Sequence, residues 1–221
     1  MPYPPDTVTT TGAFLLVLAL VVPVVSVLLA FVAGGRHAER ITLATLPLGL
    51  AIAVAIAVVL RRTSGPLVYL LGGWTPPLGV ALRADGLSVV MLAIAAVVIA
   101  IVGVFARADF PTPAGSARAP FAFWILLLAI WAALNAVFLA GDLFTLYVAL
   151  ELLTFAAVPL VCLDGRAETL QAALRYLLFA LIGSVLYLAG TALLYGSYGT
   201  LDIVLLSQRV QAEPAVLVAA G

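Results

Sequence analysis

The sequence has little material for a water-exposed surface or for a metal centre. It contains no lysine, one cysteine (Cys162) and one histidine (His37), and only 9% of its 221 residues are charged. With one cysteine and one histidine, we expect no internal disulfide, no cofactor, and no zinc, haem or iron–sulfur centre held by this chain alone. Ten acidic residues balance ten arginines, so no net positive field exists to attract nucleic acid.

Long apolar runs are what the sequence has in abundance. Hydrophobic residues make up 65% of the chain and the mean hydropathy is +1.27, far outside the range of soluble domains. The runs lack the polar stripe of a soluble amphipathic helix and the alternation of a barrel strand. The sequence therefore predicts an all-α fold, a polytopic membrane helix bundle. Six runs have the roughly 20 residues that a transmembrane helix needs, at residues 12–33, 41–60, 86–106, 121–140, 143–163 and 176–195.

The segments between these runs divide the chain into four parts. Residues 61–85 are rich in glycine and proline and contain Tyr69 and Trp74; because Tyr and Trp favour the headgroup level, we expect an interfacial hairpin there. After an amphipathic linker, Glu213 and Pro214 resemble a helix start, but the seven residues that follow are too few to cross a membrane. The expected parts are two leading helices (1–60), the hairpin (61–85), helices 3 to 6 (86–202), and the linker with an incomplete seventh helix (203–221).

The arginines are distributed unevenly between the two sides of the expected bundle. Six of them fall on one side and four on the other, and the positive-inside rule places the richer side in the cytoplasm. We therefore expect a multi-pass protein of the plasma (inner) membrane with its amino terminus outside. The richer side holds Arg36, Arg40, Arg107, Arg118, Arg166 and Arg175, and the poorer side Arg61, Arg62, Arg83 and Arg209.

Glu151 is the one charged residue inside the six runs, near the middle of the fifth. A charge at this depth costs on the order of 3 kcal/mol, so an intramembrane carboxyl is by default a functional hypothesis. A nearby cation would favour the ionised form and the low dielectric the neutral form, which suits a group that loads and releases a proton. The alternative is a protonated carboxyl that bonds to a neighbouring helix as structural glue.

Four further residues are candidates for a proton pathway. Tyr147 and Thr154 lie one turn either side of Glu151 on the same helix face, where their hydroxyls bond either to the carboxyl or to backbone. Asn135 in the fourth run either donates an interhelical hydrogen bond or holds a water. Arg175, expected at the start of the sixth helix, either snorkels to the interface or enters the bundle.

Two other features have structural interpretations. Asp142 precedes the fifth run and lies nine residues from Glu151, on the opposite helix face, so we expect it to cap the helix. Gly183 and Gly190 share a face of the sixth helix, where small residues allow another helix to approach closely.

Two stretches resemble a known family. GGWTPPLGVALRADGLSVVML (72–92) is similar to the segment before the third helix in a proton-conducting subunit of Mrp-type cation/proton antiporters. GDLFTLYVALELLTFAAVPLV, followed by ALRYLLFALIGSVLYLAGTALLYGSYGTLDI (141–203 overall), resembles helices 5 and 6 of antiporter-like subunits. That superfamily includes the Mrp subunits and the large membrane subunits of respiratory complex I and of membrane-bound hydrogenases.

The resemblance implies roles for two residues. Glu151 occupies the position of a helix 5 glutamate that is coupled, in the family, to a lysine on a broken helix 7. Arg175 stands where several members have lysine, and because arginine does not release its proton at ordinary pH, it implies a static charge partner. The helix 7 lysine and the second half of the family's fold are not in this sequence.

The sequence thus predicts part of a proton-translocating, cation/proton antiporter-like subunit that is incomplete alone. Expected partners are the lipid bilayer and other membrane subunits of an Mrp-type or complex I-like assembly, with protons and Na⁺ or K⁺ as the ions. The sequence offers no self-contained catalysis, and the assembly would be either an antiporter or a proton-pumping oxidoreductase. The alternative is a structural scaffold subunit or a non-functional remnant.

Overall fold

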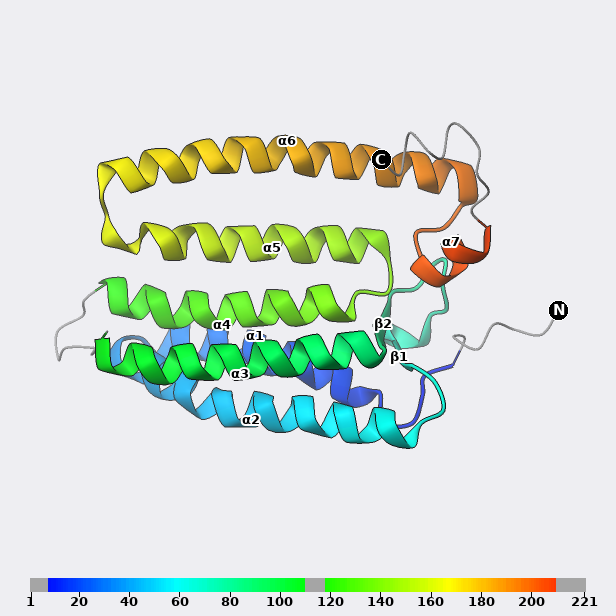
Figure 1. Cartoon of the computed structure of the whole chain (residues 1–221), viewed down its shortest axis with the longest axis horizontal. Coiled ribbons are helices and arrows are strands. Elements are labelled where there is room, and N and C mark those ends of the chain that lie inside the picture. The colour runs from blue at the N-terminus through cyan, green and yellow to red at the C-terminus, as the bar shows by residue number, and fades with distance from the viewer. Residues whose placement is uncertain (1–7, 110–117, 210–221) are drawn as a thin grey trace.

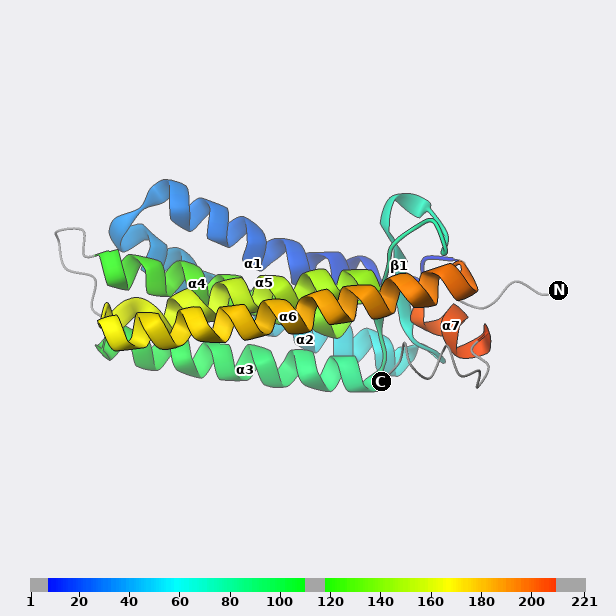
Figure 2. The same cartoon turned by 90° about the horizontal axis from the view of Figure 1, so that it is seen from above.

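The computed structural model describes residues 8–109 and 118–209. Six long helices run back and forth beside one another, and a β-hairpin and a short helix lie at one end of the bundle (Figures 1 and 2). The long helices are α1 (Phe14–Ala33), α2 (Gly35–Arg62), α3 (Gly86–Asp109), α4 (Arg118–Leu139), α5 (Leu143–Val161) and α6 (Ala167–Tyr198). The short elements are β1 (Leu67–Leu70), β2 (Ala81–Ala84), two 3₁₀ turns at Leu71–Gly73 and Cys162–Asp164, and α7 (Ile203–Arg209).

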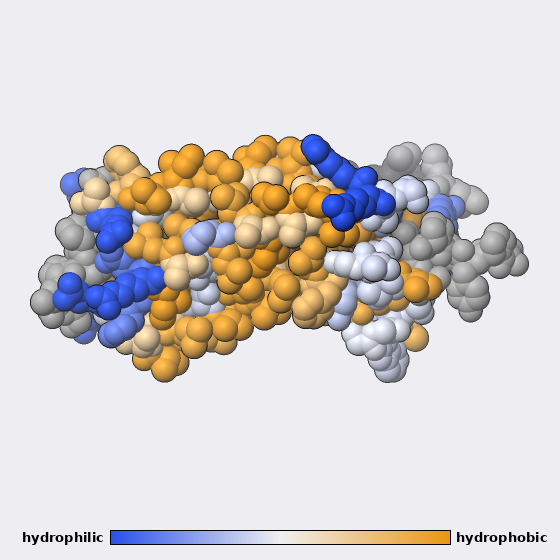
Figure 3. Space-filling model, turned by 90° about the horizontal axis from the view of Figure 1, so that it is seen from below, coloured by the Kyte–Doolittle hydropathy of each residue, from blue (hydrophilic) through white to orange (hydrophobic). Residues whose placement is uncertain are grey.

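All six long helices are apolar and long enough to cross a membrane. The space-filling view shows a broad hydrophobic band around the middle of the molecule, with hydrophilic residues towards its two ends (Figure 3). Such a surface suits hydrocarbon, and continuous helices satisfy their own backbone groups there. The predicted class, an all-α membrane bundle with six spanning helices, is confirmed.

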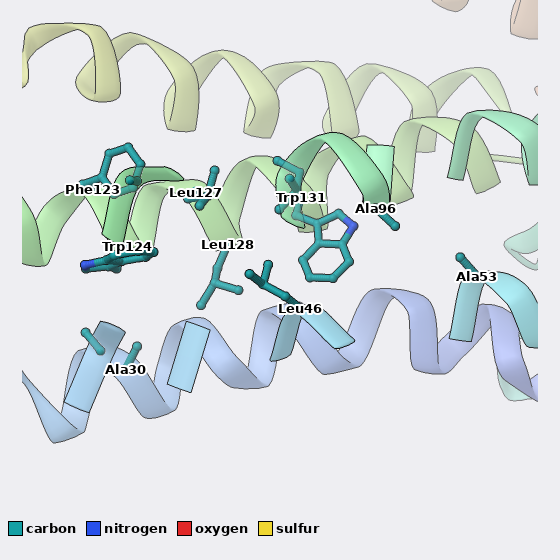
Figure 4. Close-up of a cluster of buried hydrophobic side chains, with 12 residues drawn as sticks. Ala30, Leu46, Ala53, Ala96, Phe123, Trp124, Leu127, Leu128 and Trp131 are labelled. Atoms are coloured by element: carbon teal, nitrogen blue, oxygen red, sulfur yellow. The ribbon is translucent and has the colours of Figure 1, made fainter. Parts of the chain in front are cut away.

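The core lies among α1, α2, α3 and α4. Trp124 and Trp131 of α4, exposed by 0% and 1%, are its largest side chains, and Leu46, Ala53 and Ala96 from α2 and α3 pack around them (Figure 4). Helix α5 packs on α4, and α6 lies outermost, against α5 (Figure 1). Among the described spans, α6 has the smallest buried share, only 6% of its most apolar stretch, so most of its surface has no protein neighbour in this chain.

The segment after α2 forms an antiparallel β-hairpin, which defines what we call the hairpin end of the bundle. Leu67 pairs with Ala84 and Leu70 with Ala81. The residues before α1 cover the open edge of β1: the Thr10 backbone N–H donates to the Val68 carbonyl, and Val68 and Leu70 donate to the hydroxyls of Thr10 and Thr9. An otherwise exposed strand edge is thereby paired.

The α4–α5 turn is tied into the hairpin end through its backbone. Gly141 donates to the Ala81 carbonyl of β2 at 3.1 Å and accepts from the backbone N–H of Ile203, while Leu143 donates to the Leu201 carbonyl. A Cβ atom at Gly141 would overlap the Ala81 carbonyl oxygen. Only glycine therefore permits this close approach of the two chain segments.

Replacing Gly141 with alanine should destabilise the fold by about 2 kcal/mol, because backbone rather than a flexible side chain must give way. The measurement is SDS-driven unfolding in mixed micelles. The matched control is Gly183→Ala: nothing lies within 4 Å of a Cβ at Gly183, so that change should be neutral or stabilise α6 by up to about 1 kcal/mol. Equal stabilities for the two variants would contradict the prediction.

Asp85 caps α3 at the hairpin end. Its carboxylate accepts from the backbone N–H of Ser88 at 2.8 Å and from the Ser88 hydroxyl at 3.0 Å. The backbone hydrogen bond from Ser88, which favours the ionised form, holds the pKa of Asp85 below its ordinary value of 3.8.

The Asp85 charge should therefore add a small stability, about 0.5 kcal/mol, at neutral pH. Because the pKa is lower in the folded chain, this contribution is present above the unfolded pKa and is lost as the pH falls from there through the folded pKa. Unfolding of the wild type and of Asp85→Asn, which keeps a good cap, should differ at pH 6 and converge near pH 3. A difference that stays constant with pH would refute the charge effect.

Two helix boundaries were predicted wrongly. Helix α2 begins at Gly35 and not near residue 41, so His37 lies in its first turn, and α6 begins at Ala167 and not at residue 176. In both cases the first turns carry charged residues that end an apolar run without ending the helical hydrogen bonds. The linker after Asp202 forms α7, and the expected start of a seventh helix at Glu213 lies outside the described residues.

Candidate functional site

Glu151 lies at the centre of the candidate site. It is the ninth of the nineteen residues of α5 and is half-buried. The Ser184 hydroxyl of α6 donates to its Oε1. A carboxyl at mid-span is thus held by a hydroxyl that is able to donate to the ionised form and to accept from the protonated form.

Ser184 faces α5 because of the way α6 packs. The better-covered positions of α6 recur every three or four residues, as expected for one face of a helix. That face meets α5, and the remaining faces are exposed. Its residues are Ala173, Leu177, Ala180, Ser184, Tyr187 and Thr191.

Towards the hairpin end, two tyrosines extend the contact between α5 and α6. Tyr147 stacks on Tyr187, with ring centroids 5.9 Å apart and 19° between the ring planes. The Tyr187 hydroxyl donates to the Leu143 carbonyl at 3.0 Å. Tyr147 is therefore beside the α5–α6 contact, one turn from Glu151, as the sequence predicted.

Thr154 lies one turn from Glu151 on the other side. Its hydroxyl donates to the Leu150 carbonyl of its own helix at 3.1 Å. Of the two alternatives open for this hydroxyl, the structure has the bond to backbone.

Arg175 does not begin α6, as predicted, but lies eight residues inside it, because the helix starts at Ala167. The side chain is exposed, and within residues 8–109 and 118–209 it makes no ion pair. Nine residues separate Arg175 from Ser184, which places the two on opposite faces of α6 and about 13 Å apart along its axis. The structure therefore does not bring Arg175 to Glu151.

Asn135 is buried in α4, with 5% of its surface exposed, and its Nδ2 donates to the Ala19 carbonyl of α1 at 2.7 Å. It serves the contact between α1 and α4 and is not part of the α5–α6 contact. Asp142 caps α5 as expected: its carboxylate accepts from the backbone N–H of Thr145 at 2.7 Å and from the Thr145 hydroxyl at 2.6 Å.

Ser184 and Tyr187 are the two site residues that the sequence reasoning missed. A hydroxyl adds little polarity to an apolar run, so neither residue stands out by hydropathy. The available signal was their spacing: with Thr191 they place a hydroxyl on one helix face at successive turns. In the described part of the chain, no three His, Cys, Asp or Glu residues come together as metal ligands.

The chain is similar to proteins of one family. Residues 140–220 match the family described as "NADH:quinone oxidoreductase/Mrp antiporter, TM". The chain is 30% identical over 198 residues to the "Putative antiporter subunit mnhD2" of Staphylococcus aureus (strain MRSA252), an alignment that covers 89% of this chain and 39% of that protein.

Two solved structures share the fold. A chain of the Mrp complex from Dietzia sp. DQ12-45-1b matches with a TM-score of 0.80 and 28% identity, over 95% of this chain and 39% of that one. A chain of the membrane-bound sulfane sulfur reductase, an archaeal respiratory membrane complex, matches with a TM-score of 0.83 and 25% identity, over 95% and 42%. The present chain thus spans well under half the length of these relatives. With its six spanning helices, it is a polytopic membrane protein that belongs to the NADH:quinone oxidoreductase/Mrp antiporter family.

Proposed function

We propose that the chain forms part of a proton-translocating, cation/proton antiporter-like subunit that works in a multisubunit membrane complex. In this proposal Glu151 binds and releases the proton, and protons exchange for Na⁺ or K⁺. Helices α3 to α6 would then hold the start of the first antiporter-like repeat.

The observation that carries the proposal is the placement of Glu151 between two spanning helices. The carboxyl lies at mid-span, where ionisation is costly without a partner, and it is held by Ser184 instead of being neutralised by an arginine. Such a group is free to respond to a cation brought by another helix. The cation would have to come from outside the described residues, because Arg175 lies on the other face of α6.

The outer surface of α6 supports a role within a larger assembly. Leu178, Phe179, Ile182 and Leu186 are each more than half exposed, and together they form an apolar face without a protein neighbour in this chain. Further helices of a longer subunit, or other membrane subunits, would cover this face, and lipid would cover the rest.

We further propose that the complex lies in the plasma (inner) membrane with the hairpin end outside. The loops at the opposite end and the first turns beside them carry Arg36, Arg40, Arg107, Arg118 and Arg166, whereas the hairpin end carries Arg61, Arg62, Arg83 and Arg209. The bias in arginine favours this orientation.

The proposed function is tested by cation/proton exchange in everted membrane vesicles. A pH gradient is set up by respiration and followed with acridine orange, and Na⁺ or K⁺ is then added. Vesicles from cells that contain the chain should lose the gradient on cation addition, and vesicles from otherwise identical cells that lack it should keep the gradient. Equal responses from the two kinds of vesicle would refute the proposal.

A further inference from the structure

Proline in α1 leaves one backbone carbonyl without its helical partner. Pro23 has no N–H, so the carbonyl four residues earlier, that of Ala19, receives no bond from it. Asn135 of α4 supplies the missing donor through Nδ2, at 2.7 Å. The asparagine therefore replaces, from another helix, the hydrogen bond that proline removes.

The other half of the same amide is unpaired. Because only the amide nitrogen is able to donate to a carbonyl, the bond to Ala19 fixes the orientation of the side chain. Oδ1 of Asn135 then has no hydrogen-bond partner among the described residues, although the side chain is 95% buried. A buried acceptor without a donor is costly, and such groups are usually paired with protein or with ordered water.

Asn135 lines a cavity that is closed in by α1, α2, α3 and α4. Its volume is about 10 Å³, close to the minimum needed for one water molecule. Ala19 and Pro23 line it from one side, and Trp131 lies in its wall. The Ala19 carbonyl has two lone pairs, of which Asn135 takes one.

We propose that this cavity is a binding site for one water molecule. The water donates one hydrogen to Oδ1 of Asn135 and the other to the second lone pair of the Ala19 carbonyl. It thereby completes the polar link between α1 and α4 at the point where proline interrupts α1. The volume excludes larger ligands.

Hydroxyl-radical footprinting of the full chain in lipid nanodiscs tests the proposal, because X-ray pulses generate radicals from internal water as well as from bulk. Trp131 is 1% exposed and lines the cavity, whereas Trp124 is 0% exposed and does not. Asn135→Leu has a similar volume and binds no water. In this variant, labelling of Trp131 should fall several-fold relative to wild type, and labelling of Trp124 should stay unchanged.

Two results would overturn the water site: no labelling of Trp131 in the wild type, or the same labelling in Asn135→Leu. A change at both tryptophans would mean that the variant has opened the bundle. In that case the wild-type density from electron cryomicroscopy decides, at a resolution that shows buried waters. A peak within about 3.2 Å of both Oδ1 and the Ala19 oxygen supports the site, and an empty cavity overturns it.

Discussion

Glutamine in place of Glu151 should reduce cation/proton exchange on the order of 100-fold, the typical contribution of a side chain that transfers a proton. Glutamine has nearly the same volume, and its Oε1 is able to accept the hydrogen bond that Ser184 donates to Glu151, so the α5–α6 contact should persist. What the amide lacks is a proton that it can bind and release. The measurement is the rate of cation-dependent loss of the pH gradient in everted vesicles, normalised to the amount of chain in the membrane.

Glu168→Gln is the matched control. Glu168 lies in the first turn of α6 and is exposed, so the same chemical change there should leave exchange near the wild-type rate. Wild-type exchange in Glu151→Gln, with the chain present at normal levels, would remove Glu151 from the proton pathway. It would favour a scaffold role, in which the carboxyl only joins α5 to α6.

The spanning helices were readable from the sequence because hydrocarbon imposes a length and a composition on them. Their ends were less readable, and α6 shows why. Glu168 and Arg175 break the apolar run at its start, yet Ala167–Tyr198 is one continuous helix. Long side chains keep their charges at the interface while the backbone continues to hydrogen-bond.

Of the candidate site, the carboxyl was predictable and its partner was not. A lone charge in an apolar run has a large energetic cost, which makes Glu151 conspicuous. Ser184 carries no such cost, and its role depends on which face of α6 meets α5. That contact joins residues 33 positions apart in the chain, and only the packing of the two helices decides it.

Asn135 shows the same limit in another form. That Pro23 frees the Ala19 carbonyl follows from the sequence alone, because proline lacks an N–H. Which donor replaces that N–H does not follow, since Asn135 is 116 residues away. Local chemistry is thus visible in the sequence, and its long-range completion becomes visible only in the fold.

The second large effect should come from Trp131, which fills the space between α4 and α2. Replacing it with alanine should lower the free energy of unfolding by about 3 kcal/mol, the low end for such a core truncation. The low end applies because lipid is as apolar as the core, which leaves lost packing as the main cost. The measurement is SDS-driven unfolding in mixed micelles. Phe121→Ala, which truncates a partly buried aromatic at the edge of the same core cluster, should cost less.

Gly49 of α2 makes this prediction sharper, because a Cβ atom there would overlap the six-membered ring of Trp131. In the wild type, Gly49→Ala should therefore destabilise the bundle by about 2 kcal/mol through overpacking, although alanine is the better helix former. In the Trp131→Ala background the ring is gone and only the helix propensity remains, so the same change should stabilise by up to about 1 kcal/mol. The sign of the effect should reverse between the two backgrounds, which helix propensity alone cannot produce. If Gly49→Ala has the same effect in both, the contact between Gly49 and Trp131 does not exist in the membrane-embedded protein.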